Sequence, residues 1–455
     1  MKIGLIFPRF KYPTGDPPLG LAYIAASLSK NTKADIKFID TTFYTDKNEI
    51  KQELENEFFD IVGISVMTTM LNDALWIASY IKSVSPNTKI FFGGPHPTVL
   101  PDISINYENV DGIVIGEGEV TFSEIVNNNG DPTNIAGCWF KKNKEIIRNP
   151  LRKPMSNLDD LEYPARHLLN MNEYIFNWFQ MDSISAGLRG TNISATRGCP
   201  YRCSYCQPTL NSLFGKKLRK RNPIETVREL IFLKKKYKIQ SFIFVDDTLN
   251  IDRKWLHEFC RELIKSNLNL LWGCNIRANL ARHDDLSLMK ESGLRKIFFG
   301  IESLNPRILD EIYQKDITLT QVENTIDIAK QLDLKIQGYF MLGAPTETRK
   351  DLLNTINNAR KFDIDDATFS ITTPLPGTFL YDKTQQYIDK SLGDFDYYKS
   401  YVYNDEFGFN QKTLNIYKFA AFCCFYLTPK RLFNTFKMVA SLDGIRKTLM
   451  KLKRI

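Results

Sequence analysis

The segment Cys199-Pro200-Tyr201-Arg202-Cys203-Ser204-Tyr205-Cys206 places three cysteines within eight residues. It closely follows an apolar strand expected at Asn192–Ala195, so the cysteines are predicted to lie on the loop after that strand. A tetrahedral zinc site needs a fourth protein ligand, and His167 and His257 have no finger-like spacing to the cysteines. A disulfide would leave one thiol unpaired. Three soft sulfur ligands with one ligand missing favour an iron–sulfur cluster that keeps one iron open for a small molecule.

The cysteine loop begins a series in which apolar strands alternate with helical patterns. One helix start is well marked, because Asn222 can cap the helix and Pro223 fits its first position. Six strand–helix units predict a partial (β/α)6 barrel, which we place at residues 186–385. The strands are expected at Asn192–Ala195, Ser241–Val245, Leu270–Asn275, Lys296–Gly300, Lys335–Leu342 and Ala367–Thr372.

A similar alternation occupies the start of the chain. Short apolar runs separated by helices predict a Rossmann-like, doubly wound parallel sheet in an α/β domain over residues 1–135. Residues 136–185 lose this periodicity and are expected to form a linker, and residues 386–455 are expected to form a mainly helical C-terminal region. The strands of the first domain are expected at Lys2–Phe7, Ile36–Asp40, Ile61–Val66, Lys89–Phe92 and Gly112–Ile115.

The ligand of the first sheet is not an ordinary nucleotide. Neither a Gly-x-Gly-x-x-Gly turn after the first strand nor a Gly-Lys-Ser/Thr phosphate loop is present in the sequence. The polar and glycine-rich residues follow the strands instead, at Ser65–Thr69, Gly93–Pro97 and Gly116–Glu119. In sheets of this kind ligands bind outside the carboxyl ends of the strands, so these tracts are the predicted binding edge.

The composition is that of a globular protein, with 43% hydrophobic and 25% charged residues. Eight cysteines in 455 residues are too few for a disulfide scaffold and favour a reducing, cytoplasmic location. Residues 430–455 hold eight Lys or Arg and one Asp, and therefore most of the net charge of +8. Because the rest of the chain is nearly neutral, we expect no nucleic-acid partner. The basic tail leaves open a peripheral membrane contact at the surface.

The cysteine spacing, with an aromatic residue before the last cysteine, resembles the signature of the radical S-adenosylmethionine (radical SAM) superfamily. The resemblance implies a [4Fe–4S] cluster on Cys199, Cys203 and Cys206, with SAM chelating the fourth iron. An electron passed through the cluster would then break SAM and release a 5′-deoxyadenosyl radical. The protein itself supplies position and exclusion of water.

The resemblance also implies SAM contacts at the later strand ends. Many members carry Gly-Gly-Glu after the second barrel strand, whereas this chain has Val245-Asp246-Asp247. Both aspartates therefore stay candidates for the methionine amine. The implied SAM-binding residues are Tyr205, Asp246, Asp247, Arg277, Gly300, Glu302, Ser303 and Gly343.

The glycine-rich tracts of the first domain resemble the cobalamin-binding domain that precedes the radical SAM barrel in one large subclass. Small residues would let a flat corrin ring lie against the backbone. The Asp-x-His-x-x-Gly pattern whose histidine ligates cobalt is absent, and His96 does not replace it, so we expect no histidine ligand to cobalt. The implied cobalamin-binding residues are Ser65, Thr68, Thr69, Gly93, Gly94, His96, Gly116, Glu117, Gly118 and Glu119.

Two alternatives stay open for this domain. Glu117 and Glu119 equally fit a helix start, where the helix dipole favours carboxylates. For the domain as a whole the alternative to cobalamin binding is a degenerate sheet that only supports the barrel, or one that binds another flat or nucleotide ligand.

The leading expectation is a cobalamin-dependent radical SAM enzyme that methylates an unactivated carbon through methylcobalamin. The alternatives are oxidative cyclisation, ring contraction or carbon–carbon coupling with the same cofactors and, more remotely, a non-enzymatic cobalamin or redox sensor. We expect a small-molecule or lipid-like substrate and an external electron donor. The sequence identifies no catalytic residue beyond the cofactor ligands.

Overall fold

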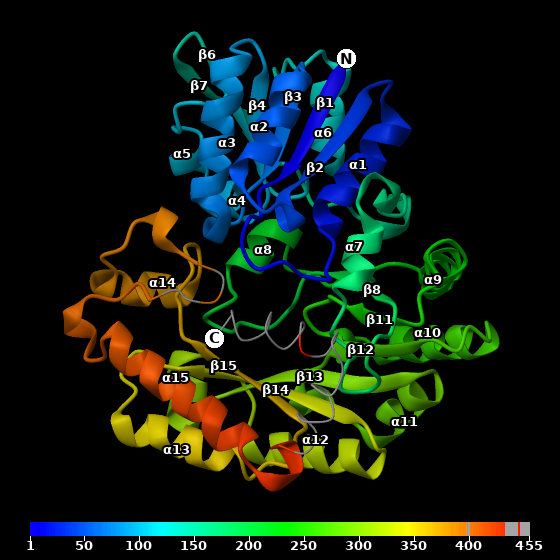
Figure 1. Ribbon diagram of the computed structural model, residues 1–455, viewed down its shortest axis with the longest axis vertical. Coiled ribbons are helices and arrows are strands. Elements are labelled where there is room, and N and C mark those ends of the chain that lie inside the picture. The colour runs from blue at the N-terminus through cyan, green and yellow to red at the C-terminus, as the bar shows by residue number, and fades with distance from the viewer. Residues whose placement is uncertain (397, 399–400, 433–444, 446–455) are drawn as a thin grey trace. The chain divides into compact units, whose positions relative to one another are not determined.

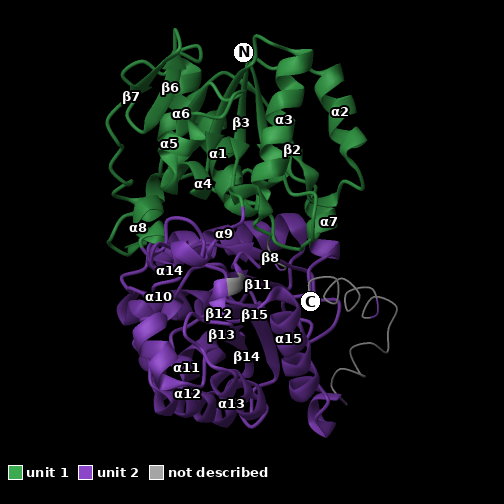
Figure 2. Ribbon diagram, turned by 90° about the vertical axis from the view of Figure 1, so that its left-hand side faces the viewer, with its two compact units in different colours: residues 1–174, 208–219, 391–396 green, residues 175–207, 220–390, 397–455 purple. Residues whose placement is uncertain are grey.

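The protein is described from a computed structural model, and the structure describes residues 1–396, 398, 401–432 and 445. The chain divides into two compact units (Figure 2). Unit 1 consists of residues 1–174, 208–219 and 391–396, and unit 2 of residues 175–207, 220–390 and 397–455. Each unit is therefore assembled from segments that are distant in the sequence.

Unit 1 is built on a seven-stranded sheet in the order β2-β1-β3-β4-β5-β6-β7 (Figure 1). Strands β1 to β5 are parallel, whereas β6 and β7 are antiparallel to their neighbours. The five predicted strands are all present, with ends within one residue of those expected. The strands are β1 (Lys2–Phe7), β2 (Asp35–Asp40), β3 (Ile61–Ser65), β4 (Lys89–Gly93), β5 (Gly112–Val114), β6 (Cys138–Lys142) and β7 (Glu145–Arg148).

Helices cover both faces of the parallel part of this sheet. On one face Ile90 and Phe92 belong to a buried cluster with α2 and α3 residues, and on the other Phe91 packs edge to face on Phe122 of α6. The doubly wound prediction is thus confirmed. The helices are α1 (Leu19–Asn31), α2 (Lys47–Asn56), α3 (Leu71–Val84), α4 (Pro95–Val99), α5 (Pro101–Ser104), α6 (Gly118–Asn127) and α8 (Thr209–Phe214), with α7 (Met171–Phe176) where unit 1 gives way to unit 2.

Unit 2 contains six parallel strands in the order β15-β14-β13-β12-β11-β8. They are the six strands expected for a partial barrel, and β8 and β15 are its two edges. The strands are β8 (Gly190–Ile193), β11 (Ser241–Phe244), β12 (Leu271–Asn275), β13 (Leu294–Glu302), β14 (Lys335–Leu342) and β15 (Asp366–Ile371). The short strands β9 (Thr196–Arg197) and β10 (Arg219–Lys220) flank the cysteine segment.

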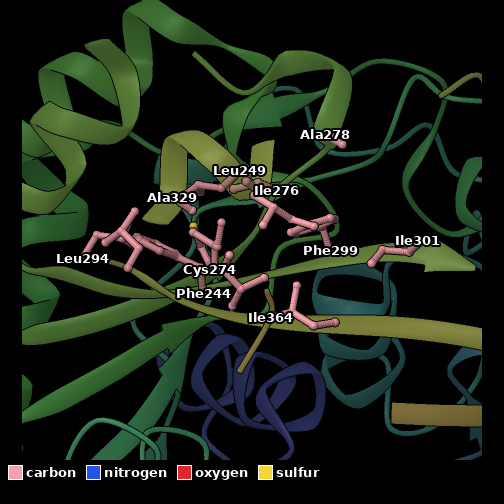
Figure 3. Packing of buried hydrophobic residues seen from close by; sticks show 14 of the residues in the cluster. Phe244, Leu249, Cys274, Ile276, Ala278, Leu294, Phe299, Ile301, Ala329 and Ile364 are labelled. Carbon is pink, nitrogen blue, oxygen red and sulfur yellow. The ribbon is translucent and has the colours of Figure 1, made fainter. Parts of the chain in front are cut away.

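Helices follow the strands of unit 2 and bury one face of its sheet. Figure 3 shows part of this core, in which Phe244, Cys274 and Phe299 of adjacent strands pack with Ala329 of a helix. The first helix starts as predicted, since the Asn222 side chain accepts from the amide of Ile224. The helices are α9 (Pro223–Tyr237), α10 (Arg253–Lys265), α11 (His283–Glu291), α12 (Leu319–Gln331), α13 (Arg349–Ala359), α14 (Phe379–Thr384) and α15 (Gln411–Tyr426).

In the described part of the C-terminal region the long helix is α15, which packs on β15 and α13, and loops with short 3-10 turns precede it. The expectation of a basic membrane-facing tail falls mostly on residues 433–455, which, apart from residue 445, lie outside the described residues. Among the helices of the described ranges, none has both the length and the apolar character needed to cross a bilayer.

Candidate cofactor sites

The cysteine loop is a compact turn at the carboxyl edge of the unit 2 sheet. Its backbone closes on itself, since the amides of Cys206 and Gln207 donate to the carbonyl of Cys203 at 3.0 and 2.9 Å. The Gln207 side chain donates to the carbonyl of Cys199 at 3.1 Å. All three thiols are free, with Cys199 and Cys203 buried and Cys206 half-buried. The turn thus presents three reduced sulfur ligands, as an iron–sulfur cluster requires.

A neighbouring segment, residues 312–316, holds this loop in place. The amide of Ser204 donates to the carbonyl of Tyr313 at 2.9 Å, and the Ser204 hydroxyl donates to the carbonyl of Ile312 at 2.5 Å. The Tyr205 ring meets the buried Tyr313 ring edge to face, with centroids 5.6 Å apart. The two residues between the second and third cysteines are therefore both fixed, Ser204 by hydrogen bonds and Tyr205 by a ring contact.

Tyr205 also belongs to a charged network that the sequence did not fully reveal. The Lys315 ammonium donates to the Glu302 carboxylate at 2.6 Å and to the Tyr205 hydroxyl at 2.8 Å, and that hydroxyl donates to Glu302 at 3.0 Å. Glu302 and Lys315 are buried, and desolvation together with the Glu302 charge raises the pKa of Tyr205. Lys315, which belongs to no recognisable motif, thus brings together two predicted SAM-binding residues, Tyr205 and Glu302.

Gly300 makes room for this network. Glu302 has a left-handed backbone (φ +64°) where the pairing of β13 with β14 shifts register. A Cβ added at Gly300 would overlap both the Glu302 carboxylate and the Lys315 ammonium. The predicted site glycine is therefore required for packing of the network.

Arg277, after β12, points its guanidinium at the cysteine loop. One N–H lies 3.6 Å from the Cys203 sulfur, and another donates to the carbonyl of Asp316 at 3.1 Å. The guanidinium stacks 3.7 Å above the Tyr201 ring. The side chain is 6% exposed. A predicted SAM residue thus touches a predicted cluster ligand directly.

The two aspartates after β11 have different surroundings. Asp246 is buried and its carboxylate accepts from the amides of Ala195 and Thr196, while burial raises its pKa to about 6. Asp247 is an exposed residue, yet desolvation of its carboxyl group raises its pKa to about 6, and its charge acts on Cys199 and Cys206. Asp246 holds the backbone that leads into the cysteine loop, which leaves Asp247 as the carboxylate available to a ligand.

The remaining predicted SAM residues serve the strand ends. Ser303 is buried and its hydroxyl accepts from the amide of Asn305, and Gly343 (φ +79°) packs against Leu414. Glu347, which sequence reasoning missed, accepts from the amides of Gly343 and Ala344, and burial raises its pKa to about 7. The available signal was a carboxylate two residues after Gly343-Ala344-Pro345.

The edge of unit 1 is assembled from neutral groups around His96. This ring is fully buried, with Nδ1 3.0 Å from the Thr68 hydroxyl and Nε2 3.1 Å from the Tyr107 hydroxyl. Burial lowers the pKa of His96 to about 4, so the imidazole is neutral at pH 7. Both ring nitrogens of His96 are hydrogen-bonded to protein hydroxyl groups, so the histidine supports the edge as a buried neutral side chain.

Glycine turns and one unused hydroxyl lie at this edge. Gly94 and Gly116 have left-handed backbones (φ +92° and +79°), and Thr98 connects them by accepting from the amide of Gly116 and donating to the carbonyl of Gly94. The Thr69 hydroxyl is buried without a hydrogen-bond partner among the described residues. These glycines and the Thr69 hydroxyl fit a flat ligand. Such a ligand would lie on the glycines and form a hydrogen bond with Thr69. Ser65, Gly93 and Gly118 complete the edge at the ends of β3 and β4 and the start of α6.

The two predicted glutamates have structural partners. Glu117 forms a two-pronged ion pair with Arg219 at 2.8 and 3.0 Å and accepts from the amide of Met155. Both charged side chains of the pair are nearly buried. Glu119 lies in the first turn of α6, and its carbonyl accepts from Ser27 and Ser123. Glu117 therefore anchors the segment 208–219, which leaves the cysteine loop and returns to unit 1.

Across the described residues, no three His, Cys, Asp or Glu side chains converge to hold a single metal ion. A [4Fe–4S] cube takes one thiolate at each of three irons, so it does not require such convergence. The three free thiols fit the cluster, and the glycine edge with its unused hydroxyl fits a corrin.

Comparison with known proteins assigns both halves of the chain. Residues 12–126 match the B12 binding domain family, and residues 193–377 match the Radical SAM superfamily. An uncharacterized methyltransferase of Pyrococcus horikoshii is 34% identical over 84% of this chain and 83% of its own length. The anaerobic magnesium-protoporphyrin IX monomethyl ester cyclase of Rubrivivax gelatinosus is 28% identical over 84% of this chain and 68% of its own length.

A solved structure shares the fold. The radical SAM methyltransferase TsrM from Kitasatospora setae, with cobalamin and a [4Fe–4S] cluster bound, superposes with a TM-score of 0.70 at 17% identity. The match covers 85% of this chain and 75% of that chain.

Proposed function

Because the chain belongs to the cobalamin-dependent radical SAM enzymes, which join a B12-binding domain to a radical SAM domain, we propose that it methylates an unactivated carbon. The observation that carries the proposal is the cysteine loop, where three free thiols lie on one turn fixed by Ser204 and Tyr205. The similarity to a protein named as a methyltransferase supports methyl transfer as the outcome.

The cofactors of this family are a [4Fe–4S] cluster, SAM and cobalamin. When bound, the cluster passes the electron that cleaves SAM, and cobalamin carries the methyl group to the substrate. An external one-electron donor supplies the electron.

In this proposal the residues of unit 2 bind and orient. Cys199, Cys203 and Cys206 hold the cluster, and Asp247 rather than Asp246 receives the methionine amine. The network of Tyr205, Glu302 and Lys315 keeps the third cysteine in register with the end of β13. Because Glu302 and Lys315 neutralise each other in a buried setting, Tyr205 is held without leaving a net charge beside the cofactor.

In unit 1 the proposed cobalamin edge is the surface of Gly93, Gly94, Gly116 and Gly118, with Thr69 as a hydrogen-bonding contact. His96 positions this edge through Thr68 and stays neutral. A neutral, glycine-lined edge suits a large, flat ligand because it adds little desolvation cost when covered.

For the substrate we propose a small molecule or a lipid-like molecule, handled in the cytoplasm or at a membrane surface. Exposed apolar side chains on or just after α15 support the lipid-like option, since Ile416, Phe419 and Leu427 are all more than half exposed. Basic residues of the sequence follow them directly.

A test that needs no substrate uses SAM labelled with ¹³C in its methyl group. The protein is reconstituted anaerobically with iron, sulfide and cobalamin, reduced, and incubated with labelled SAM. We expect an iron–sulfur absorption band, 5′-deoxyadenosine and labelled methylcobalamin in mass spectra. Cys203→Ala serves as the control and should give no deoxyadenosine. Deoxyadenosine without any methylation of cobalamin would contradict methyl transfer.

Cyclisation or ring contraction with the same cofactors is the second candidate. The similarity to a cyclase of Rubrivivax gelatinosus over most of this chain favours it. It predicts the deoxyadenosine of the previous experiment without the labelled methylcobalamin.

A further inference from the structure

We propose that Arg277 raises the reduction potential of the cluster by placing its guanidinium against the Cys203 sulfur. The inference rests on the proposed function, since it requires that Cys199, Cys203 and Cys206 hold a [4Fe–4S] cluster. It gives Arg277 a role other than the SAM contact expected from the sequence.

The geometry aims a charged donor at one cluster ligand. An N–H of Arg277 lies 3.6 Å from the Cys203 sulfur, which is within reach of an N–H···S hydrogen bond. Hydrogen bonds to cluster sulfurs are one of the means by which a protein sets the cluster potential. A guanidinium is a positively charged donor in proteins, so the proposed contact brings a positive charge to the sulfur as well as a hydrogen bond.

Contacts of both its guanidinium and its backbone amide hold Arg277 beside the cysteine loop. Its guanidinium lies 3.7 Å above the Tyr201 ring and donates to the carbonyl of Asp316, and its amide donates to the Asn250 side chain. Asp316 has a left-handed backbone (φ +53°), which turns that carbonyl toward the arginine and toward Asn279. Tyr201, Arg277 and Asp316 therefore form one assembly beside the cluster loop.

The charge balance supplies the strongest argument. Arg277 is 6% exposed, and its Nε is buried without a partner among the described residues. No carboxylate in the described part of the chain lies within ion-pair distance of the guanidinium, which contacts the Asp316 carbonyl, the Tyr201 ring and the Cys203 sulfur. A buried cation is unfavourable unless an anion offsets it. The thiolates of Cys203 and its neighbours are the anions in reach.

The consequence follows from the chemistry of reduction. A [4Fe–4S] core on three thiolates is anionic, and it gains a further negative charge when it takes one electron from the external donor; no proton moves and no bond breaks in this step. A fixed positive charge at the sulfur stabilises the reduced form more than the oxidised form. Arg277 should therefore make the cluster easier to reduce.

The experiment is a redox titration of the anaerobically reconstituted full-length protein, followed by electron paramagnetic resonance in the absence of SAM. The variants are Arg277→Gln, which removes the charge, and Arg277→Lys, which keeps it but loses the planar fork. Tyr201→Leu removes the ring beneath the guanidinium. We expect Arg277→Gln to shift the reduction equilibrium about tenfold toward the oxidised cluster. This shift lowers the reduction potential by about 59 mV for one electron. Arg277→Lys and Tyr201→Leu should give smaller shifts of the same sign.

Arg431→Gln is the matched control. Arg431 is equally well buried, stacks 3.8 Å from the Phe425 ring and donates to the carbonyls of Ile364 and Phe362, which lie outside the cysteine loop. Its substitution should leave the cluster potential unchanged even where it lowers the thermal stability of the protein.

The outcomes separate this inference from the proposed function. A cluster with the same potential in the wild type and in Arg277→Gln overturns the inference and leaves the proposed function standing, including when that variant binds SAM more weakly. A wild-type protein that binds no iron overturns both. If Arg277→Gln fails to assemble a cluster, Arg277→Lys and Tyr201→Leu decide, and unchanged potentials in both reject the inference.

Discussion

The cysteine loop of unit 2 and the glycine-rich edge of unit 1 both lie at the carboxyl ends of parallel strands. The side chains around the two places differ in their charge. Charged side chains surround the thiols, among them Arg277, Lys315 and Asp247. At the unit 1 edge His96 is uncharged and the Thr98 hydroxyl joins two glycine turns, while the charged Glu117 and Arg219 are paired with each other.

The difference reflects what each place is expected to hold. A cluster changes charge when it is reduced, so fixed charges near it alter its function. A corrin needs a flat surface of backbone and small residues, where an uncompensated charge would only add a desolvation penalty. Five substitutions test this contrast, in order of decreasing expected effect.

Cys203→Ala should produce the largest change. Removing one of three thiolates should abolish the iron–sulfur absorption band and SAM cleavage, because the remaining protein ligands cannot hold the cluster. Cobalamin binding, measured by absorbance after gel filtration, should persist. Retention of a full complement of iron would contradict the assignment of this loop.

Lys315→Met should destabilise unit 2 by about 3–5 kcal/mol, because it leaves the Glu302 carboxylate buried without its cation. Denaturant unfolding measures the change. Lys265→Met is the control, since the pair of Lys265 with Glu262 is exposed at the lysine and should matter little. Equal effects of the two substitutions would mean that the Tyr205 network does not depend on its charges.

His96 makes the stability of unit 1 sensitive to acid. Its pKa in the fold is about 4, below the 6.5 of an unfolded histidine, so unfolding takes up a proton between these values. The contribution of His96 to the free energy of unfolding should be fully present above pH 6.5. The free energy of unfolding should then fall by about 3 kcal/mol as the pH drops to 4. His96→Gln should remove this dependence, whereas the exposed His283→Gln should not. An unchanged acid profile in His96→Gln would show that the imidazole is not held neutral.

Gly300→Ala should cost about 1–3 kcal/mol, since the added methyl group overlaps the Glu302 and Lys315 side chains. Gly20→Ala is the matched control, because nothing lies within 4 Å of the new carbon in α1. Thermal unfolding compares the two. A neutral Gly300→Ala would mean that the network relaxes easily and is not a rigid support for Tyr205.

Thr69→Val should have the smallest effect on the protein itself. The hydroxyl has no partner among the described residues, so removing it should leave the free energy of unfolding nearly unchanged. Cobalamin should bind about tenfold more weakly, a loss of about 1.4 kcal/mol, if the hydroxyl contacts it. Equilibrium dialysis measures the affinity, and equal affinities would remove Thr69 from the cobalamin edge.

The strands and the turn that carries the three cysteines could be predicted because their signals are local. The apolar runs that became β1 to β5 carry their own pattern, and the three cysteines lie within one short segment. The hairpin of β6 and β7 was not predicted, since it falls within the expected linker. Its turn uses Asn143 and Lys144 with left-handed backbones (φ +52° and +70°), without the glycine that usually marks such a turn.

Residues that act from a distance could not be found in the same way. Lys315 reaches Tyr205 across 110 positions, and no pattern in the sequence connects them. The proposal that Asp247 rather than Asp246 receives the methionine amine also needed the structure, because only the fold shows that the Asp246 carboxylate accepts from the amides of Ala195 and Thr196.

The ion pair of Glu117 with Arg219 has a practical consequence for anyone who wishes to dissect this protein. Arg219 is encoded downstream of the cluster cysteines but folds with the amino-terminal unit. An amino-terminal fragment that ends anywhere in residues 136–185 would lack Arg219. Its Glu117 carboxylate would then be nearly buried without a compensating positive charge. The two units are therefore best expressed together as one chain. A shorter protein that contains only unit 1 would need residues 208–219 joined to residues 1–174.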